Sequence, residues 1–399
     1  MVTYSRAEAA DRAGVDIEEV GRLVELGIVS PQAGDRLSPG DVRRVELAQS
    51  LAEAGIPLDG LAAAIRRGEV SLDFVDAPVY ERFSLLSTVT FQELSDRTGV
   101  PVSLLSVIRE AAGSAQPSPE DLVRDDELVI GSFLEAQVAA GFRPAAIERL
   151  LRVQGDSLRR IAETEADWWR TEVIEPALAA GKRPDDIAAA DFSTQLTELS
   201  EKSLMAMYHS QEMHSWTSNI IDGLEMMLSA AGLHSRLERP PAMCFLDITG
   251  YTRLTQERGD EAAAALAAEL ARLVQRTSVQ HGGRPVKWLG DGVMFHFPNP
   301  GPGVVAALDM VDGVADAGLP PAHVGLHAGP VIFQEGDYYG ATVNVASRIA
   351  EYARPGEVLV SQQVVEASTG TDVAFREIGP VELKGVAEAM HLHAASRPG

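Results

Sequence analysis

The spacing of apolar positions changes near residue 240 and divides the chain into two parts. Up to residue 236, Ala, Leu, Val and Ile recur every three or four positions among Arg and Glu, which predicts amphipathic helices. From Ala242 onward, short apolar runs alternate with helical stretches, which indicates an α/β or α+β domain. The pattern therefore predicts a multidomain chain, with an all-α N-terminal half and a mixed C-terminal domain.

The N-terminal half contains an internal repeat. The stretch FQELSDRTGV at 91–100 echoes RAEAADRAGV at 6–15, and each copy continues with Ser-Pro and an acidic residue. We interpret residues 1–80 and 81–155 as two copies of one helix-turn-helix-like module. Residues 156–236 complete this half as a helical linker or dimerisation region, in which a long helix or a broken helix pair is expected because proline is absent from 193 to 237.

Composition narrows the classes of partner. The net charge of −24 argues against unaided binding to nucleic acid or to an anionic membrane. No apolar run approaches the roughly 20 residues that a membrane span needs, and the N-terminus lacks the apolar core of a secretion signal. The single cysteine, Cys244, fits a reducing compartment. We expect a cytoplasmic protein without a membrane span.

Two aspartates interrupt apolar, strand-like segments of the C-terminal domain. Asp247 lies within the apolar run MCFLDI, which is typical of a buried strand, and Asp291 lies in a Gly-Asp-Gly turn between the strand-like runs 285–289 and 293–297. Taken singly, Asp247 could end the strand and cap the next turn, and Asp291 could simply be a residue of the hairpin turn. Taken together, two carboxylates in these positions suit hard divalent cations, which prefer oxygen ligands.

A third candidate lies in the stretch GDYYGATVNVASRIA. Asn344 and Arg348 are four residues apart in a predicted helix, so they share a face. A carboxamide beside a guanidinium suits a sugar and a phosphate, although an exposed polar pair is the alternative for this stretch alone. His209 and His214 are five apart and do not share a helix face, so a polar surface or a packing role is favoured over a metal site.

Five stretches carry a family resemblance. FLDITGYTRL, VKWLGDGVMFHF, VGLHAGPV, GDYYGATVNVASRIA and VELKG occur in this order between residues 245 and 385. Together they resemble the catalytic domain of the class III nucleotidyl cyclases over about residues 242–396. The resemblance implies an α+β catalytic domain with a ferredoxin-like core over 240–396, which forms a 3′,5′-cyclic nucleotide and pyrophosphate from a nucleoside triphosphate.

The resemblance also implies roles for individual residues. Two divalent cations, Mg²⁺ or Mn²⁺, would be bound by Asp247, Ile248 and Asp291 and would drive attack of the ribose 3′-hydroxyl on the α-phosphate. Arg348 would stabilise charge at the α-phosphate, and Asn344 would orient the ribose. The remaining phosphate contacts would come from Ile248, Thr249, Gly250, Tyr251 and Lys384, with His323 at a position where many relatives carry arginine.

Base recognition is implied for Lys287 and Asp337. A lysine donor to N1 and an aspartate acceptor for the 6-amino group complement adenine, whereas guanine presents the reverse pattern. The resemblance therefore implies ATP as substrate, with guanylate cyclase as the disfavoured alternative. In this family the metal aspartates and the base and transition-state residues come from opposite chains, so a homodimer with two shared sites is implied.

The first repeat resembles the winged helix-turn-helix of MerR-type regulators over about residues 4–65. Residues 1–70 hold eight Arg and twelve Asp or Glu, a net charge of 8 − 12 = −4, which disfavours DNA binding. We expect a regulatory domain that controls the cyclase in response to an effector such as pH or a small apolar ligand. A transcription regulator that only senses nucleotide is the competing hypothesis, disfavoured by the complete set of catalytic residues.

Overall fold

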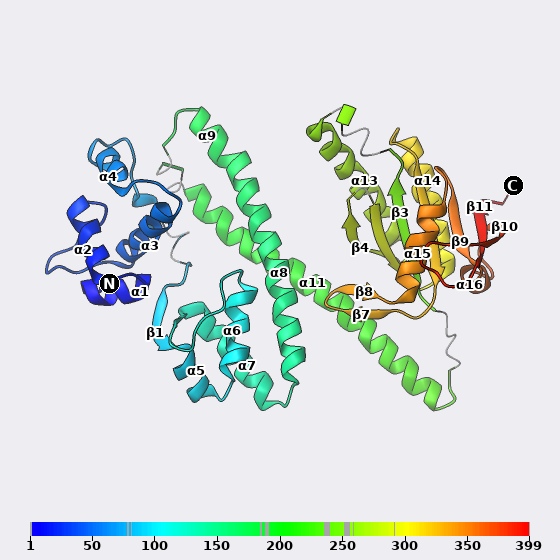
Figure 1. Ribbon diagram of the computed structural model, residues 1–399, viewed down its shortest axis with the longest axis horizontal. Helices are drawn as coiled ribbons and strands as arrows, with labels where there is room; N and C mark the ends of the chain where they lie inside the picture. Colours follow the sequence, from blue (N-terminus) through cyan, green and yellow to red (C-terminus); the bar gives the residue numbers. More distant parts are fainter. Residues whose placement is uncertain are drawn as a thin grey trace. The chain divides into compact units, whose positions relative to one another are not determined.

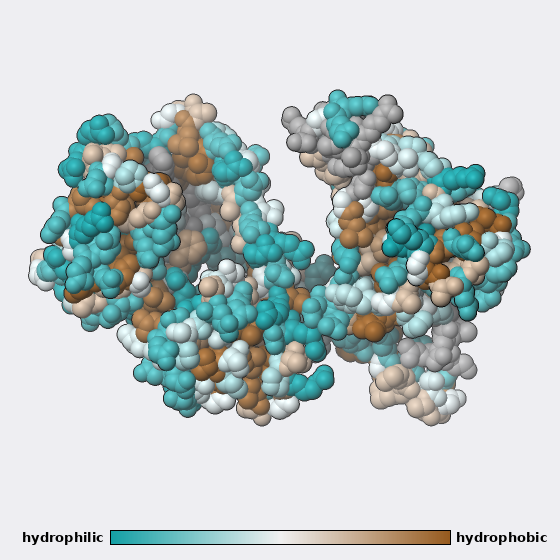
Figure 2. Space-filling model, viewed as in Figure 1, coloured by the Kyte–Doolittle hydropathy of each residue, from teal (hydrophilic) through white to brown (hydrophobic). Residues whose placement is uncertain are grey.

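The computed structural model describes residues 2–77, 80, 82–183, 186–187, 191–234, 240–250, 256–257, 259–290 and 292–398 (Figure 1). The chain divides into two compact units, unit 1 over Met1–Ile221 and unit 2 over Asp222–Gly399. The visible faces are mainly hydrophilic (Figure 2), in line with the net charge of −24. Within the described residues, no helix has both the length and the hydropathy required to span a membrane.

Unit 1 is helical apart from two short paired strands, which confirms the predicted helical N-terminal half. Its elements are α1 (Arg6–Ala13), α2 (Ile17–Leu26), α3 (Pro39–Glu53), α4 (Leu58–Arg66), the 3₁₀ helix η1 (Asp73–Asp76), β1 (Leu86–Thr90), α5 (Phe91–Thr98), α6 (Val102–Ala111), β2 (Leu122–Arg124), α7 (Asp125–Ala139), α8 (Pro144–Trp169), the π-helix η3 (Arg170–Ile174), α9 (Glu175–Ala179) and α11 (Asp191–Ala230).

The repeated stretches begin and end their helices in the same way. Ser5 and Thr90 each accept a hydrogen bond from the backbone N–H of a glutamate three residues later, so both α1 and α5 start with a capping box. Gly14 and Gly99 end these helices in the left-handed region, with φ of 70° and 72°. That the two stretches are copies of one helix-turn-helix-like module stays a prediction.

Each stretch packs into a core of its own. One cluster gathers around Leu23, Leu37 and Val45, and the other around Phe91 and Leu105. Two small modules each require a core of their own, and these two clusters are consistent with that requirement. The boundaries 1–80 and 81–155 remain predictions.

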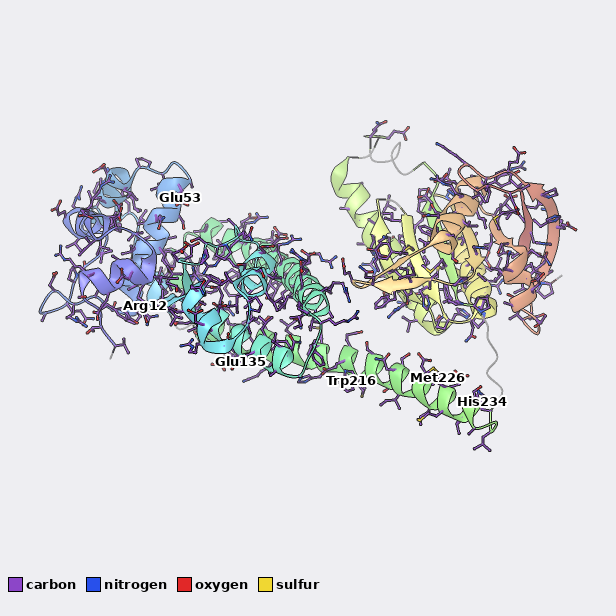
Figure 3. The ribbon with its side chains drawn as sticks, turned by 60° about the horizontal axis from the view of Figure 1, so that its bottom comes forward. Arg12, Glu53, Glu135, Trp216, Met226 and His234 are labelled. Atoms are coloured by element: carbon purple, nitrogen blue, oxygen red, sulfur yellow. The ribbon has the colours of Figure 1, made fainter. Side chains whose placement is uncertain are left out.

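Helix α11 is one continuous helix of 40 residues, one of the two forms expected for this segment. It carries several exposed apolar side chains, among them Met213, Trp216 and Met226, at 62%, 63% and 60% of full exposure. Trp216 and Met226 project from the helix in Figure 3. The helix crosses the division between Ile221 and Asp222, so it belongs to both units.

Unit 2 is built on a seven-stranded mixed sheet, which confirms the predicted mixed domain; the ferredoxin-like core stays a prediction. The strand order is β10-β11-β9-β6-β3-β5-β4, with β6 and β9 parallel and the other pairs antiparallel. Its elements are β3 (Ala242–Ile248), α13 (Asp260–Gln280), β4 (Arg284–Leu289), β5 (Gly292–Phe297), α14 (Pro300–Asp316), β6 (Ala322–Ala328), β7 (Ile332–Gln334), β8 (Asp337–Tyr339), α15 (Ala341–Tyr352), β9 (Val358–Ser361), α16 (Gln362–Ala367), β10 (Ala374–Val381) and β11 (Met390–Ser396).

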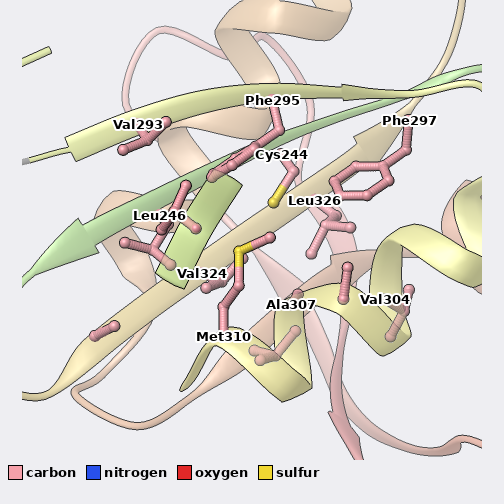
Figure 4. Packing of buried hydrophobic residues seen from close by; sticks show 14 of the residues in the cluster. Cys244, Leu246, Val293, Phe295, Phe297, Val304, Ala307, Met310, Val324 and Leu326 are labelled. Atoms are coloured by element: carbon pink, nitrogen blue, oxygen red, sulfur yellow. The ribbon is translucent and has the colours of Figure 1, made fainter. Parts of the chain in front are cut away.

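Strand β3 supplies side chains to two different clusters. Cys244 and Leu246 join the main core with residues of α14 such as Met310 (Figure 4). Burial raises the pKa of the Cys244 thiol, so this cysteine is a packing residue. Met243 packs instead with side chains of β8 and α15. Because side chains alternate along a strand, Asp247 lies on the Met243 face of the sheet.

Gly325 allows α15 to cross strand β6 at close range. A Cβ atom at this position would lie 2.1 Å from the backbone nitrogen of Ala350, a separation that no side chain can occupy. The absence of a side chain therefore sets the distance between the sheet and the helix that bears Asn344 and Arg348.

Two partly buried imidazoles make the stability of unit 2 depend on pH. His296 and His327 are the cross-strand neighbours of Met243 on β5 and β6. The His296 ring stacks on Tyr338, and His327 Nδ1 lies 2.8 Å from Ser361 Oγ. Burial lowers the pKa of both histidines to about 4.

The unfolded chain takes up these two protons near pH 6.5, whereas the folded chain takes them up only near pH 4. Stability is therefore full above pH 6.5 and lost as the pH falls toward 4. We expect a loss of about 1–2 kcal/mol for each histidine at pH 5, allowing for partial exposure. Urea unfolding at pH 7.5 and 5.0 checks this. The double variant His296→Gln, His327→Gln should show a flatter dependence, and an unchanged slope would contradict the expectation.

Candidate active site on the sheet face of Asp247

Asp247 lies near the end of β3, between two neighbouring strands. Its register partners are Gly292 on β5 and His323 on β6. A Cβ atom on Gly292 would lie 3.3 Å from Asp247 Oδ1, so the glycine leaves room for the carboxylate. The side chain is 46% exposed. An accessible carboxylate at a strand end offers the oxygen ligands that Mg²⁺ and Mn²⁺ prefer, so this residue fits a divalent cation.

Asp291, the second predicted metal ligand, lies outside the described residues, as does Tyr251. The described residues contain no cluster of three or more His, Cys, Asp and Glu side chains suited to a metal ion. Gly292, the chain neighbour of Asp291, is the residue that pairs with Asp247.

His323 contacts the predicted metal and phosphate residues. Its Nε2 lies 3.7 Å from Asp247 Oδ2, and its Nδ1 lies 3.2 Å from Thr249 Oγ1. The imidazole is only 13% exposed. The imidazole therefore lies beside both Asp247 and Thr249, a position that sequence reasoning missed because it depends on the register between β3 and β6.

The predicted phosphate-binding turn begins directly after β3. Ile248 is buried at the end of the strand, and the backbone N–H of Thr249 donates to Pro321 O over 2.9 Å. Gly250 has a φ of 80°, which only glycine adopts readily, so the chain can turn sharply at this point.

Lys287 and Asp337, the predicted base-reading residues, form an ion pair although 50 positions separate them. Lys287 belongs to β4, at the edge of the main sheet, whereas Asp337 belongs to β8 in the separate β7–β8 hairpin. The other oxygen of Asp337, Oδ1, accepts a hydrogen bond from the backbone N–H of Tyr338 over 2.8 Å. The carboxylate is thus held at both oxygens.

Helix α15 carries Asn344 and Arg348 four residues apart, with Asn344 exposed and Arg348 partly exposed. Arg348 donates to Glu351 on the same helix over 2.6 Å, and this hydrogen bond raises the pKa of the guanidinium. Sequence reasoning missed Glu351, although its i,i+3 spacing from Arg348 signals the pair. Lys384 is exposed between β10 and β11, at the opposite sheet edge from Lys287.

The described contacts gather the predicted residues into three groups. The first comprises Asp247, Thr249 and His323 at the strand ends, and the second is the ion pair of Lys287 with Asp337. The third is the exposed face of α15. Carboxylate, cationic and amide groups of this kind suit a substrate with phosphates, a sugar and a base.

Several known proteins are similar to this chain. The family profile of the adenylate and guanylate cyclase catalytic domain matches residues 238–395. The pH-sensitive adenylate cyclase of Mycobacterium tuberculosis is 28% identical over 329 residues, which cover 77% of this chain and 78% of that protein. An adenylate cyclase of Streptomyces coelicolor is 27% identical over 270 residues, covering 67% of this chain and 68% of that protein. The crystal structure of an adenylyl cyclase from P. aeruginosa covers 40% of this chain and 95% of its own, with 21% identity and a TM-score of 0.36.

Proposed function

Because residues 238–395 match the family profile of the adenylate and guanylate cyclase catalytic domain, we propose that the chain is an adenylate cyclase that converts ATP to 3′,5′-cyclic AMP and pyrophosphate. The observation that carries the choice of ATP is the ion pair between Lys287 and Asp337. The ammonium group can donate to adenine N1, and the carboxylate can accept from the 6-amino group. Guanine presents an acceptor and a donor in the opposite places, so the pair disfavours GTP.

In this proposal the metal ligands lie at the end of β3. Asp247, Asp291 and the backbone of Ile248 would hold two divalent cations. Bound there, the cations would supply Lewis-acid activation of the ribose 3′-hydroxyl and neutralise charge on pyrophosphate. His323 stands beside the Asp247 carboxylate, with its Nε2 3.7 Å from Asp247 Oδ2.

The other residues bind and orient the nucleotide. Arg348, whose Nη1 donates to Glu351, would neutralise charge at the α-phosphate, and Asn344 would hold the ribose hydroxyl in line. The backbone N–H of Thr249 already donates to Pro321 O, so the phosphates would be held by the backbone N–H groups of Ile248, Gly250 and Tyr251. Lys384 and His323 would complete the phosphate contacts.

We also propose that two copies of the chain complete each site together. Near the base-reading pair, β4 and β7 expose apolar side chains. Trp288, Leu289, Ile332 and Phe333 are 43%, 47%, 62% and 57% exposed. Exposed apolar groups beside a functional site favour an interface, and a second copy in twofold symmetry would bring its own metal group to this place.

Unit 1 is proposed to regulate the cyclase without binding DNA. It contains a cavity of about 650 Å³ whose walls include Phe74, Tyr80, Phe83, Trp168 and Trp169. A cavity of this size and lining suits a small apolar ligand as effector, and pH is the second candidate. Helix α11, which continues into unit 2, is the element through which either signal would pass.

A cyclic-nucleotide assay with ATP and GTP, in Mg²⁺ and in Mn²⁺, tests the proposed reaction. We expect cyclic AMP as the product, with kcat/KM for ATP at least about a hundredfold above that for GTP, because a site built around hydrogen bonds rejects the wrong donor pattern strongly. The exchange Lys287→Glu should remove most of this preference. Lys202→Glu, an exposed position on α11, serves as control. Equal use of ATP and GTP, or no cyclic product, would refute the proposal.

A further inference from the structure

The hairpin that carries Asp337 is not part of the main sheet. Strands β7 and β8 have three residues each and pair only with each other among the described strands. Asp337 nevertheless meets Lys287 of β4, an edge strand of the main sheet. A two-stranded hairpin is marginally stable by itself, so side-chain contacts must hold it against the sheet.

Tyr338 provides these contacts. It is 6% exposed, whereas the next residue, Tyr339, is 47% exposed. The Tyr338 ring stacks on His296 of β5, with centroids 4.4 Å apart and an angle of 4° between the planes. It also packs against Phe333 of β7 at 5.1 Å. The ring therefore joins the hairpin to the main sheet.

Arg284 of β4 fixes the same side chain from another direction. Its Nη2 donates a hydrogen bond to the Tyr338 hydroxyl. The guanidinium carbon also lies 5.5 Å from the ring centroids of both Tyr338 and Phe333. Arg284 and His296 are register partners across β4 and β5, so one pair of neighbouring residues holds the tyrosine at its hydroxyl and its face.

The position of Tyr338 is coupled directly to Asp337. The two residues are adjacent, and the backbone N–H of Tyr338 donates to Asp337 Oδ1. Arg284 and Lys287 stand three residues apart on β4. Strand β4 thus contacts Tyr338 through Arg284 and Asp337 through Lys287. A shift of Tyr338 therefore also moves Asp337.

We propose that Tyr338, held by Arg284 and His296, is a positioning residue for base selection, which fixes Asp337 beside Lys287. The inference rests on the proposed function, in which this pair reads adenine. Without the hydroxyl contact the hairpin moves relative to β4, and Asp337 no longer meets the 6-amino group at hydrogen-bonding distance. Small displacements of positioned groups have large kinetic effects.

The test compares two adjacent hydroxyl deletions in the full chain. Tyr338→Phe should lower the ratio of kcat/KM for ATP over GTP by about tenfold, mainly through a higher KM for ATP, as expected for loss of one charge-assisted hydrogen bond. Tyr339→Phe should change it less than about twofold, because that side chain is exposed. Arg284→Met should match Tyr338→Phe, and the double variant should lose no more than either one. Equal losses with both nucleotides would overturn the proposal.

A second measurement does not depend on catalysis. Amide hydrogen exchange in residues 332–339 should be faster by about tenfold in Tyr338→Phe and unchanged in Tyr339→Phe, because the hydroxyl contact restrains the hairpin. Unchanged exchange in Tyr338→Phe would overturn the proposed positioning role of Tyr338, even if the chain proved inactive on ATP. If exchange is faster in Tyr338→Phe than in the wild type, but the wild type shows no cyclase activity, the positioning role of Tyr338 is supported and the proposed function is refuted.

Discussion

Asp247→Ala and Arg348→Ala are each expected to lose cyclase activity by at least about a hundredfold, and a mixture of the two is expected to recover about a quarter of the wild-type rate. Asp247 stands at the end of β3, and Arg348 stands on α15 in an ion pair with its own Glu351. If the two residues serve one site from opposite chains, a mixed dimer has one intact site and one doubly damaged site. Random exchange of equal amounts makes about half of the dimers mixed. Since each mixed dimer has one intact site of two, about a quarter of all sites are active.

Specific activity measured over a range of mixing ratios checks this result, with subunit exchange followed independently. Arg354→Ala, two residues beyond the end of α15, is the control and should keep nearly full activity alone. Failure of the mixture to recover, with exchange demonstrated, would mean that both residues serve a site within one chain.

Removal of residues 1–235 is expected to raise basal specific activity by about tenfold, within the usual range of coupling between sites. The two catalytic domains of a cyclase dimer must be placed accurately, since a misplacement of about 1 Å can cost a hundredfold in rate. Helix α11 runs through the division between the units without a break. A helix transmits rotation or bending, so unit 1 can bias the dimer toward a less active arrangement.

The specific activities of the truncated and full-length chains, compared at protein concentrations where both are dimeric, check this expectation. A Gly-Ser insertion after Gly232, beyond the end of α11, is the matched variant because it keeps unit 1 but adds flexible residues between α11 and β3. It should raise activity as the truncation does. Equal activity of all three proteins, at every pH and with either metal, would limit unit 1 to dimerisation or docking.

Features that depend on neighbours in the chain were predictable from the sequence. The helical spacing of unit 1 and the change of period near residue 240 identified the two kinds of domain, because each pattern reflects which faces of an element are buried. The apolar run around Asp247 predicted a strand that contains this carboxylate, and β3 includes it one residue before its end. The spacing of Asn344 and Arg348 likewise placed both residues on one helix, α15.

The partners of these residues were decided by the tertiary structure. A strand pattern does not specify which strands pair, so the contact of His323 with Asp247 follows only from the register of β6 with β3. The meeting of Lys287 with Asp337 depends on docking of a short hairpin through Tyr338. Such contacts join segments far apart in sequence, and their energy is gained only when the intervening chain has folded.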